Sequence, residues 1–229
     1  MKVSAVIVAA GGSRRMGFDK LEADLAGRPV LAHSILAFQK CDSVSEIRIV
    51  TSAEKVEGIT ALANELQATK FIECVEGGAE RHLSVWNGLK RIGEGCDLVA
   101  VHDGARPLVS PEAITDCAVA AGDFGAASLA HRVADTLKRG NDEDQVVASV
   151  SREDLWAMET PQIFRRELIL EAYLKILETN ELVTDEVSAT QALGHEVHLV
   201  DNSQPNFKIT VPGDLLLAEA VLKYFPYSG

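Results

Sequence analysis

Positively charged side chains follow the first apolar run of the sequence closely enough to hold a polyphosphate. The run, Val3–Ala10, has the length and the branched residues of a buried strand. It ends at Gly11-Gly12, where no Cβ prevents close approach to the backbone, and Arg14-Arg15 and Lys20 follow. Backbone amides at a strand end can donate to phosphate oxygens, and the cations can balance the charge. The alternative is an ordinary turn with solvated basic residues.

Two common phosphate-binding patterns are excluded for this loop. The Walker pattern needs Gly-Lys followed by Ser or Thr, whereas Gly17 is followed by Phe18. The dinucleotide pattern needs Gly-x-Gly-x-x-Gly, and Ser13 stands where its second glycine would be if Gly11 were the first. The segment is instead similar to the signature Ala-Ala-Gly-x-Gly-x-Arg-Met…Lys of nucleotidyltransferases that activate sugar and polyol phosphates. It departs from that signature at Ser13.

Two further loops carry polar side chains after apolar runs. Gly77–Val85 offers two bare amides, a cation and the hydroxyl of Ser84 at the start of a helical pattern. His102–Pro107 contains Asp103, a carboxylate suited to Mg²⁺ or a ligand hydroxyl, and Arg106, whose planar fork can bind a phosphate. The alternatives are a helix start with Ser84 on the surface, and an ion pair between Asp103 and Arg106.

Apolar periodicity predicts the elements that position these loops. The expected strands are 3–10, 47–50, 71–75, 97–101, 125–129, 196–200 and 207–210, and the expected helices are 29–41, 53–66, 81–92, 111–121, 165–177, 184–193 and 212–224. Thr184 suits the N-cap of the helix that it begins. The alternation predicts an α/β fold with a Rossmann-like, mostly parallel sheet and helices on both faces. Because ligands bind at the carboxyl ends of such strands, the three loops should open on one edge.

One segment departs from this alternation. Residues 133–138 and 146–150 flank the polar turn Gly140–Asp144, which predicts a projecting β-hairpin arm. No internal repeat or low-complexity linker is present. Residues 1–229 are therefore expected to form a single nucleotidyltransferase domain with a dimerisation arm at about 131–152. An isolated hairpin is marginal in water, so burial of its valines against a second copy would give a homodimer.

The composition restricts the classes of partner. The net charge is −12 without a run of Lys or Arg, which argues against nucleic acid. No apolar run approaches the roughly 20 residues that a membrane helix needs, and no apolar signal segment follows Met1-Lys2. The four cysteines are widely spaced, which is typical of thiols in a reducing compartment rather than of a zinc site. We therefore expect a cytoplasmic protein without nucleic-acid or membrane partners.

Taken together, the motifs resemble those of one family along nearly the whole chain. His102–Pro107 and the segments 132–138, 159–164, 184–186 and 206–210 are similar to those of the 2-C-methyl-D-erythritol 4-phosphate cytidylyltransferases. The set His-Asp-Gly-Ala-Arg-Pro, Thr-Pro-Gln-x-Phe and Asn-x-Lys-Ile-Thr is specific, whereas each piece alone is weak.

The resemblance implies a site for each of two substrates. The residues implied to contact CTP are Ala9, Ala10, Gly11, Gly12, Arg15, Lys20, Gly78, Ser84, Asp103 and Arg106. Those implied to contact the polyol phosphate are Asp103, Arg106, Thr136, Arg152, Thr160, Thr184 and Lys208. A catalytic role is implied for Arg15, Lys20, Asp103, Arg152 and Lys208.

The implied reaction joins CTP and 2-C-methyl-D-erythritol 4-phosphate to give 4-diphosphocytidyl-2-C-methyl-D-erythritol and pyrophosphate, in non-mevalonate isoprenoid precursor synthesis. The expected cofactor is Mg²⁺ or another divalent cation, held mainly by the CTP phosphates, with Asp103 as the candidate protein ligand. An arm-mediated homodimer is also implied. The alternatives are a ribitol 5-phosphate cytidylyltransferase and a non-catalytic nucleotide-binding module. The presence together of Arg15, Lys20, Asp103, Arg106 and Lys208 argues against the module.

Overall fold

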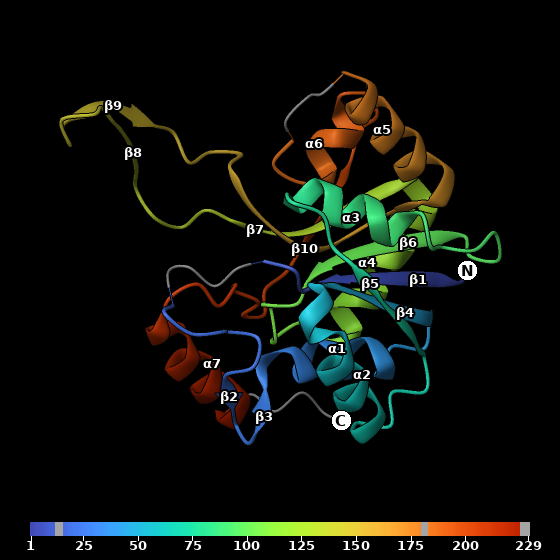
Figure 1. The fold of residues 1–229 in the computed structure, drawn as a ribbon. Helices are drawn as coiled ribbons and strands as arrows, with labels where there is room; N and C mark the ends of the chain where they lie inside the picture. The colour runs from blue at the N-terminus through green and yellow to red at the C-terminus, as the bar shows by residue number, and fades with distance from the viewer. Residues whose placement is uncertain (12–15, 180–182, 225–229) are drawn as a thin grey trace.

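The computed structural model describes residues 1–11, 16–179 and 183–224. Its main sheet has seven strands in the order β11-β7-β10-β6-β1-β4-β5 (Figure 1). These strands are β1 (Val3–Val8), β4 (Val44–Thr51), β5 (Phe71–Glu76), β6 (Leu98–Asp103), β7 (Ala126–Arg132), β10 (Trp156–Arg165) and β11 (His198–Asp201). The α-helices are α1 (Val30–Lys40), α2 (Val56–Glu65), α3 (Arg81–Leu89), α4 (Pro111–Phe124), α5 (Arg166–Thr179), α6 (Glu186–Gln191) and α7 (Pro212–Tyr224). The predicted α/β sheet, mostly parallel and covered on both faces, is confirmed.

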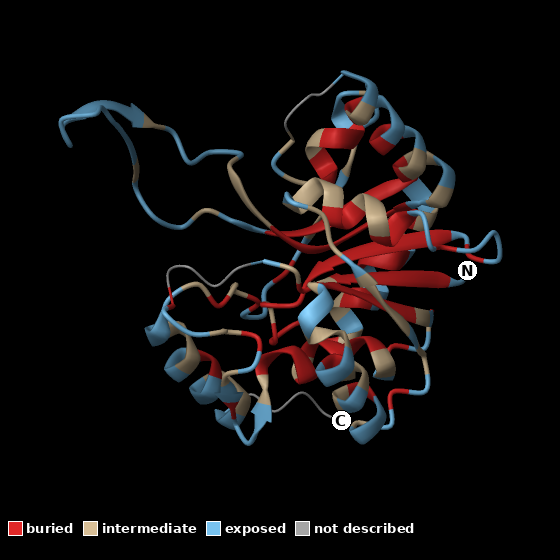
Figure 2. Cartoon of the chain, in the orientation of Figure 1, coloured by how far each residue is buried: buried red, intermediate tan, exposed pale blue. Residues whose placement is uncertain are grey.

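The sheet is covered because its central strand is apolar on both faces. β1 pairs in parallel with β4 and β6, and its side chains are buried. Ile7 packs into the core formed with α1, α2, α4 and α7, while Val6 packs into the core formed with α3, α5 and α6. Figure 2 shows this buried layer through the middle of the molecule. None of the helices among the described residues has the length and apolar character needed to span a membrane.

β10 is a strand that the sequence prediction missed. It runs antiparallel between β6 and β7, so that the sheet is mixed. Pro161 cannot donate to a ladder, which makes the segment unlike a central strand in sequence. The structure accommodates it with a shift in the pairing with β7 between Met158 and Gln162. Residues 159–161 thereby leave the regular ladder at the edge where the predicted loops lie.

The strand predicted at 207–210 is wrong, since this segment joins no ladder. It is held by hydrogen bonds to other parts of the chain. The amide of Ile209 donates to the carbonyl of Ala105 at 2.8 Å, and the Nδ2 atoms of Asn202 and Asn206 each donate to Glu159 Oε2 at 2.8 Å. The buried carboxylate of Glu159 therefore fixes the segment that leads to Lys208.

The predicted hairpin is present, although its first strand begins later than expected. β8 (Leu137–Gly140) pairs with β9 (Val146–Val150), so 133–136 are connection rather than strand. The arm leaves the sheet between β7 and β10 and is exposed along its length (Figures 1 and 2). Val146 and Val147 are 69% and 55% exposed in the single chain. A minor two-stranded sheet, β2 (Asp24–Leu25) with β3 (Arg28–Pro29), precedes α1.

Candidate active site

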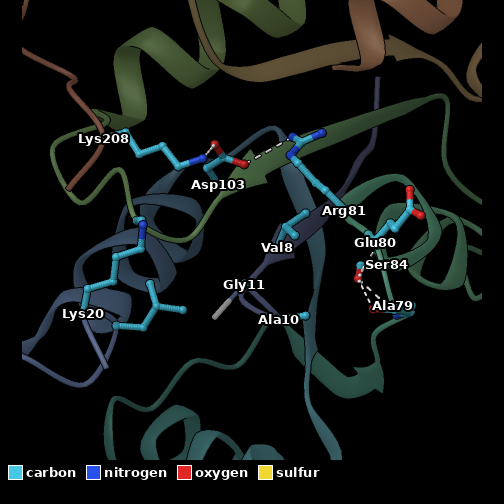
Figure 3. A pocket seen from close by; sticks show the side chains of 13 residues that line it. Val8, Ala10, Gly11, Lys20, Ala79, Glu80, Arg81, Ser84, Asp103 and Lys208 are labelled. Atoms are coloured by element: carbon cyan, nitrogen blue, oxygen red, sulfur yellow. Dashed lines mark hydrogen bonds and ion pairs between the residues drawn. The ribbon is translucent and has the colours of Figure 1, made fainter. Parts of the chain in front are cut away.

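The three loops predicted to open on one edge of the sheet meet at a single pocket of about 310 Å³. The segment 202–210 closes it from a fourth side with Lys208 (Figure 3). The lining residues are Val8, Ala10, Gly11, Lys20, Leu21, Gly78, Ala79, Glu80, Arg81, Ser84, Asp103, Ala105 and Lys208. Ala9 lies beside them, buried at the end of β1. Gly12 and Arg15 lie outside the described residues.

The loop after β5 approaches the loop after β1 too closely for any residue larger than glycine. A Cβ on Gly77 would lie 2.7 Å from Ala10 Cβ and 2.9 Å from Ser84 Oγ. Ser84 is buried rather than on the surface, and its Oγ accepts a hydrogen bond from the amide of Gly78 at 3.0 Å. The hydroxyl therefore shapes the loop that forms one wall of the pocket.

Asp103 ends β6 and is paired with two cations. Its Oδ1 accepts from Arg81 Nη2 at 3.2 Å, and its Oδ2 accepts from Lys208 Nζ at 2.7 Å. The alternative of an Asp103–Arg106 ion pair is thus replaced by these two partners. Burial alone would raise the pKa of the Asp103 carboxyl, but the charges of Arg81 and Lys208 outweigh burial and hold the pKa well below its usual range. Asp103 is therefore an anion at neutral pH.

Arg106 points into the protein. Its Nη1 donates to the carbonyl of Asn206 at 2.7 Å and its Nη2 donates to the carbonyl of Met158 at 3.2 Å. These bonds join the loop after β6 to β10 and to the segment that carries Lys208. The guanidinium therefore connects these segments on the side of the pocket wall that faces the protein interior.

Thr160 and His102 form a buried chain of hydrogen bonds behind Asp103. The Asp103 amide donates to Thr160 Oγ1 at 3.0 Å, and Thr160 Oγ1 lies 3.0 Å from His102 Nδ1. His102 Nε2 lies 3.2 Å from the carbonyl of Arg106, to which it must donate. His102 Nδ1 then accepts from the Thr160 hydroxyl. Both bonding roles of this hydroxyl are used inside the protein, which orients the Asp103 loop.

This buried histidine gives the protein a pH-dependent stability. Complete burial lowers the pKa of His102 from 6.5 to about 3. The unfolded chain therefore binds a proton that the folded chain does not, and stability falls as the pH drops below about 6.5. From about pH 7.5 to about pH 5, this histidine alone should lower the free energy of unfolding by about 2 kcal/mol. Urea unfolding should show a correspondingly smaller loss between these pH values for His102→Asn, and equal losses would contradict this assignment.

Lys20 reaches the pocket from the side opposite the loop after β5 (Figure 3). Its Nζ donates to the carbonyl of Ile209 at 2.9 Å. This bond joins the segment after β1 to the segment that carries Lys208. Two lysines, Lys20 and Lys208, therefore line the same pocket as Asp103.

Three residues implied for the polyol phosphate lie away from this pocket surface. Thr136 and Arg152 are exposed at the base of the arm, where Arg152 Nη1 donates to the carbonyl of Ala134. Thr184 is also exposed, with its Oγ1 3.1 Å from Ser188 Oγ. The prediction that Thr184 caps α6 is wrong. Asp185 is the N-cap, because its carboxylate accepts from the Ser188 amide at 2.9 Å.

Sequence reasoning missed the partner of Arg81. The Arg81 guanidinium donates to both carboxylate oxygens of Glu186, at 2.7 and 3.1 Å. Position offered one signal, since Arg81 directly follows a glycine loop and starts a helix. Nothing in the sequence joins Arg81 to a carboxylate 105 positions away.

The described residues do not by themselves build a metal site. No group of three or more His, Cys, Asp or Glu side chains among them is arranged to hold an ion. Asp103 and Glu80 are the carboxylates that line the pocket. A divalent cation there would need most of its oxygen ligands from a bound phosphate, which is how Mg²⁺ is usually held.

Comparisons with known proteins all indicate one family. The family model for 2-C-methyl-D-erythritol 4-phosphate cytidylyltransferase matches residues 3–224. The relative of that name from Alkaliphilus oremlandii is 40% identical over 225 residues, covering 97% of this chain and 95% of its own. The relative from Halalkalibacterium halodurans is 42% identical over 224 residues, covering 97% of each chain. A crystal structure of this enzyme from Thermus thermophilus superposes with a TM-score of 0.82 at 32% identity, covering 97% of this chain and all of the other. The chain belongs to the 2-C-methyl-D-erythritol 4-phosphate cytidylyltransferase family.

Proposed function

We propose that the pocket described above binds CTP and 2-C-methyl-D-erythritol 4-phosphate together and joins them directly. The products are 4-diphosphocytidyl-2-C-methyl-D-erythritol and pyrophosphate, as the family to which the chain belongs implies. One observation supports this assignment above the others. Lys20, Asp103 and Lys208 come from three distant parts of the chain and line one pocket at the carboxyl edge of the sheet. The two lysines there can position an anionic substrate and neutralise its charge.

The nucleotide would lie against the loops after β1 and β5. Ala9, Ala10, Gly11 and Gly78 supply backbone to the cytidine, and Ser84 keeps the Gly78 amide in place. Lys20 and Arg15 are assigned to the triphosphate. A slot between two glycine loops suits the edge of a pyrimidine better than a purine.

The chemical step needs positioning and charge rather than a covalent intermediate. A phosphate oxygen of the polyol phosphate attacks the α-phosphorus of CTP in line. The bond between the α-phosphorus and the bridging oxygen breaks, and pyrophosphate leaves with the electron pair. The attacking oxygen is already anionic, so no general base is required. Lys208 would position this oxygen, and Lys20 would stabilise the charge that develops on the leaving pyrophosphate.

The donor set of the pocket fits a divalent cation held mainly by phosphate. When bound, Mg²⁺ would neutralise charge on the phosphate oxygens, with Asp103 as the nearest candidate ligand among the lining residues. Both Asp103 oxygens are engaged by Arg81 and Lys208 in the structure described here. These two cations keep the carboxylate ionised and oriented toward the pocket.

The polyol-phosphate site would be completed by the arm of a second subunit. We assign Thr136 and Arg152 to the partner's pocket, because both are exposed at the base of a projecting arm. Thr184 would border the same substrate within the subunit. Thr160 would act by orienting Asp103, and Arg106 by holding the segment that carries Lys208. Residues 1–229 would then act as a single nucleotidyltransferase domain that dimerises through the arm at about 131–152.

Pyrophosphate release tests this function against its alternatives. With CTP and Mg²⁺, we expect release with 2-C-methyl-D-erythritol 4-phosphate, much less with ribitol 5-phosphate, and little when ATP or GTP replaces CTP. A preference for ribitol 5-phosphate would identify the alternative cytidylyltransferase. Binding of CTP without turnover of either polyol phosphate would identify a non-catalytic module. Equal turnover of ATP would contradict the assigned pyrimidine slot.

A further inference from the structure

Arg81 joins three elements that are distant in the sequence. It is the first residue of α3, and its side chain forms part of the pocket wall (Figure 3). Its Nη2 donates to Asp103 at the end of β6 at 3.2 Å. The two terminal nitrogens also donate to both oxygens of Glu186, the first residue of α6, at 2.7 and 3.1 Å. One guanidinium therefore links the start of α3, the Asp103 carboxylate and α6.

Glu186 depends on this arginine. Its side chain is fully buried, and a buried carboxylate is strongly destabilising without a charged, hydrogen-bonded partner. Apart from Arg81, its Oε1 accepts from the Tyr173 hydroxyl at 2.9 Å. Burial opposes the charge of Arg81, but the negative charges of Glu186 and Asp103 outweigh burial and raise the arginine's pKa above its usual value. The Arg81–Glu186 pair is therefore a buried, two-point link between α3 and α6.

The start of α6 is also attached to Gln162 on β10. Gln162 Oε1 accepts from the amides of Glu186 and Val187, each at 3.1 Å, and its Nε2 donates to Asp185 Oδ2 at 3.0 Å. These bonds attach the N-terminal end of α6 to β10. The Arg81 guanidinium, which bonds to both Glu186 and Asp103, sets the distance between the N-terminal end of α6 and the pocket. Thr184, two residues before Glu186, moves with this helix end.

We propose that Arg81 is a positioning residue for the polyol phosphate and acts through Glu186. By holding α6 beside Asp103, it places Thr184 at the distance from Lys208 that the second substrate requires. Glu186 has no exposed surface and so cannot touch either substrate. Any effect of Glu186 on substrate use must therefore pass through Arg81 or α6. This inference rests on the proposed function, because it concerns the second substrate of that reaction.

Two conservative variants test this role. Arg81→Lys keeps the positive charge but replaces the two terminal nitrogens of a planar guanidinium with one nitrogen, so it loses the two-point contact with Glu186. Glu186→Gln keeps the shape but turns an amide N–H₂ toward the guanidinium. Each variant should raise the KM for the polyol phosphate at least about 10-fold, because a displacement of about 1 Å in a substrate contact is costly. The KM for CTP should stay close to that of the wild type, because the loop from Gly78 to Ser84 is held by the Ser84 hydroxyl and not by Arg81. The double variant should be no worse than the more affected single variant, because the two residues act as one unit.

The chain offers a matched control pair away from the pocket. Arg91, just after α3, donates to both carboxylate oxygens of Glu73 on β5, at 3.1 and 2.8 Å, but Arg91 is exposed and neither residue lines the pocket. Arg91→Lys and Glu73→Gln should leave both KM values unchanged. Calorimetric titration with CTP and thermal unfolding show which variants are folded. Arg81→Lys carries the test alone if Glu186→Gln does not fold.

The outcomes separate this inference from the proposed function. A wild-type protein that makes no 4-diphosphocytidyl-2-C-methyl-D-erythritol would refute the proposed function itself. An active wild type combined with folded variants whose KM for the polyol phosphate is unchanged would overturn the role of Arg81. A parallel rise in both KM values would also overturn it, because it would indicate a general structural role.

Discussion

Lys20→Ala should lower kcat by roughly 10²- to 10³-fold while the protein stays folded. A preorganised donor that stabilises charge in the transition state is worth about 3–4 kcal/mol. Lys20 is half-buried and lines the pocket, and its Nζ donates to the carbonyl of Ile209 at 2.9 Å. Loss of a hydrogen bond of this kind costs only about 1 kcal/mol of stability. The effect on kcat should therefore greatly exceed the effect on folding, as steady-state kinetics and urea unfolding would show.

Lys70 provides the matched control for this substitution. It is also half-buried, and its Nζ donates to the carbonyl of Cys41 at 2.7 Å, away from the residues that line the pocket. Lys70→Ala should cost a similar amount of stability and leave kcat unchanged. If a folded Lys20→Ala variant matched Lys70→Ala in kcat, the assignment of Lys20 to the leaving pyrophosphate would be wrong.

Mixing two inactive variants should restore activity if the arm completes the partner's site. Lys20→Ala damages the pocket, and Arg152→Ala damages the arm. In a mixed dimer, one site then receives both defects and the other receives neither. With half of the dimers mixed, activity should return to about a quarter of the wild-type value. The measurement is turnover after co-refolding, with mixed dimers identified by mass.

Each variant refolded alone serves as the control and should remain inactive. The structure motivates this experiment because Arg152 is exposed and absent from the pocket lining of its own chain. If mixed dimers form and no activity returns, Arg152 serves its own subunit and the shared site is refuted. A protein that stays monomeric at assay concentration but is fully active would also refute it.

The sequence predicted the layout of the sheet because the strands are buried on both faces. β1 has no solvent-facing residue until Val8, so its sequence is apolar apart from Ser4, and the glycines that follow it mark the loop. The same logic placed the loops at Gly78 and Asp103 on one edge, and the structure brings both into one pocket. β10 was not predicted, because Pro161 cannot donate to a ladder and is unusual in a central strand. The structure accommodates the proline where the pairing of β10 with β7 is interrupted.

The orientation of individual side chains could not be predicted in the same way. Thr160 and Arg106 share motifs with pocket residues, yet their polar atoms bond to His102 and to backbone carbonyls behind the pocket. Glu186 lies near the start of the predicted helix 184–193, where an acidic residue at the surface would interact favourably with the helix dipole. It is buried instead, because Arg81 reaches it from a distant loop. Such pairings depend on tertiary contacts that no local pattern encodes.

The claim that both substrates meet in one pocket and react directly is tested by the stereochemistry at phosphorus. CTP that carries sulfur at a chiral α-phosphorus can be converted with 2-C-methyl-D-erythritol 4-phosphate, and the configuration of the product determined. A single in-line attack inverts the configuration at phosphorus, which is the result we predict. Retention of configuration would require two successive displacements through a nucleotide bound covalently to the protein, and it would contradict direct transfer between the two substrates.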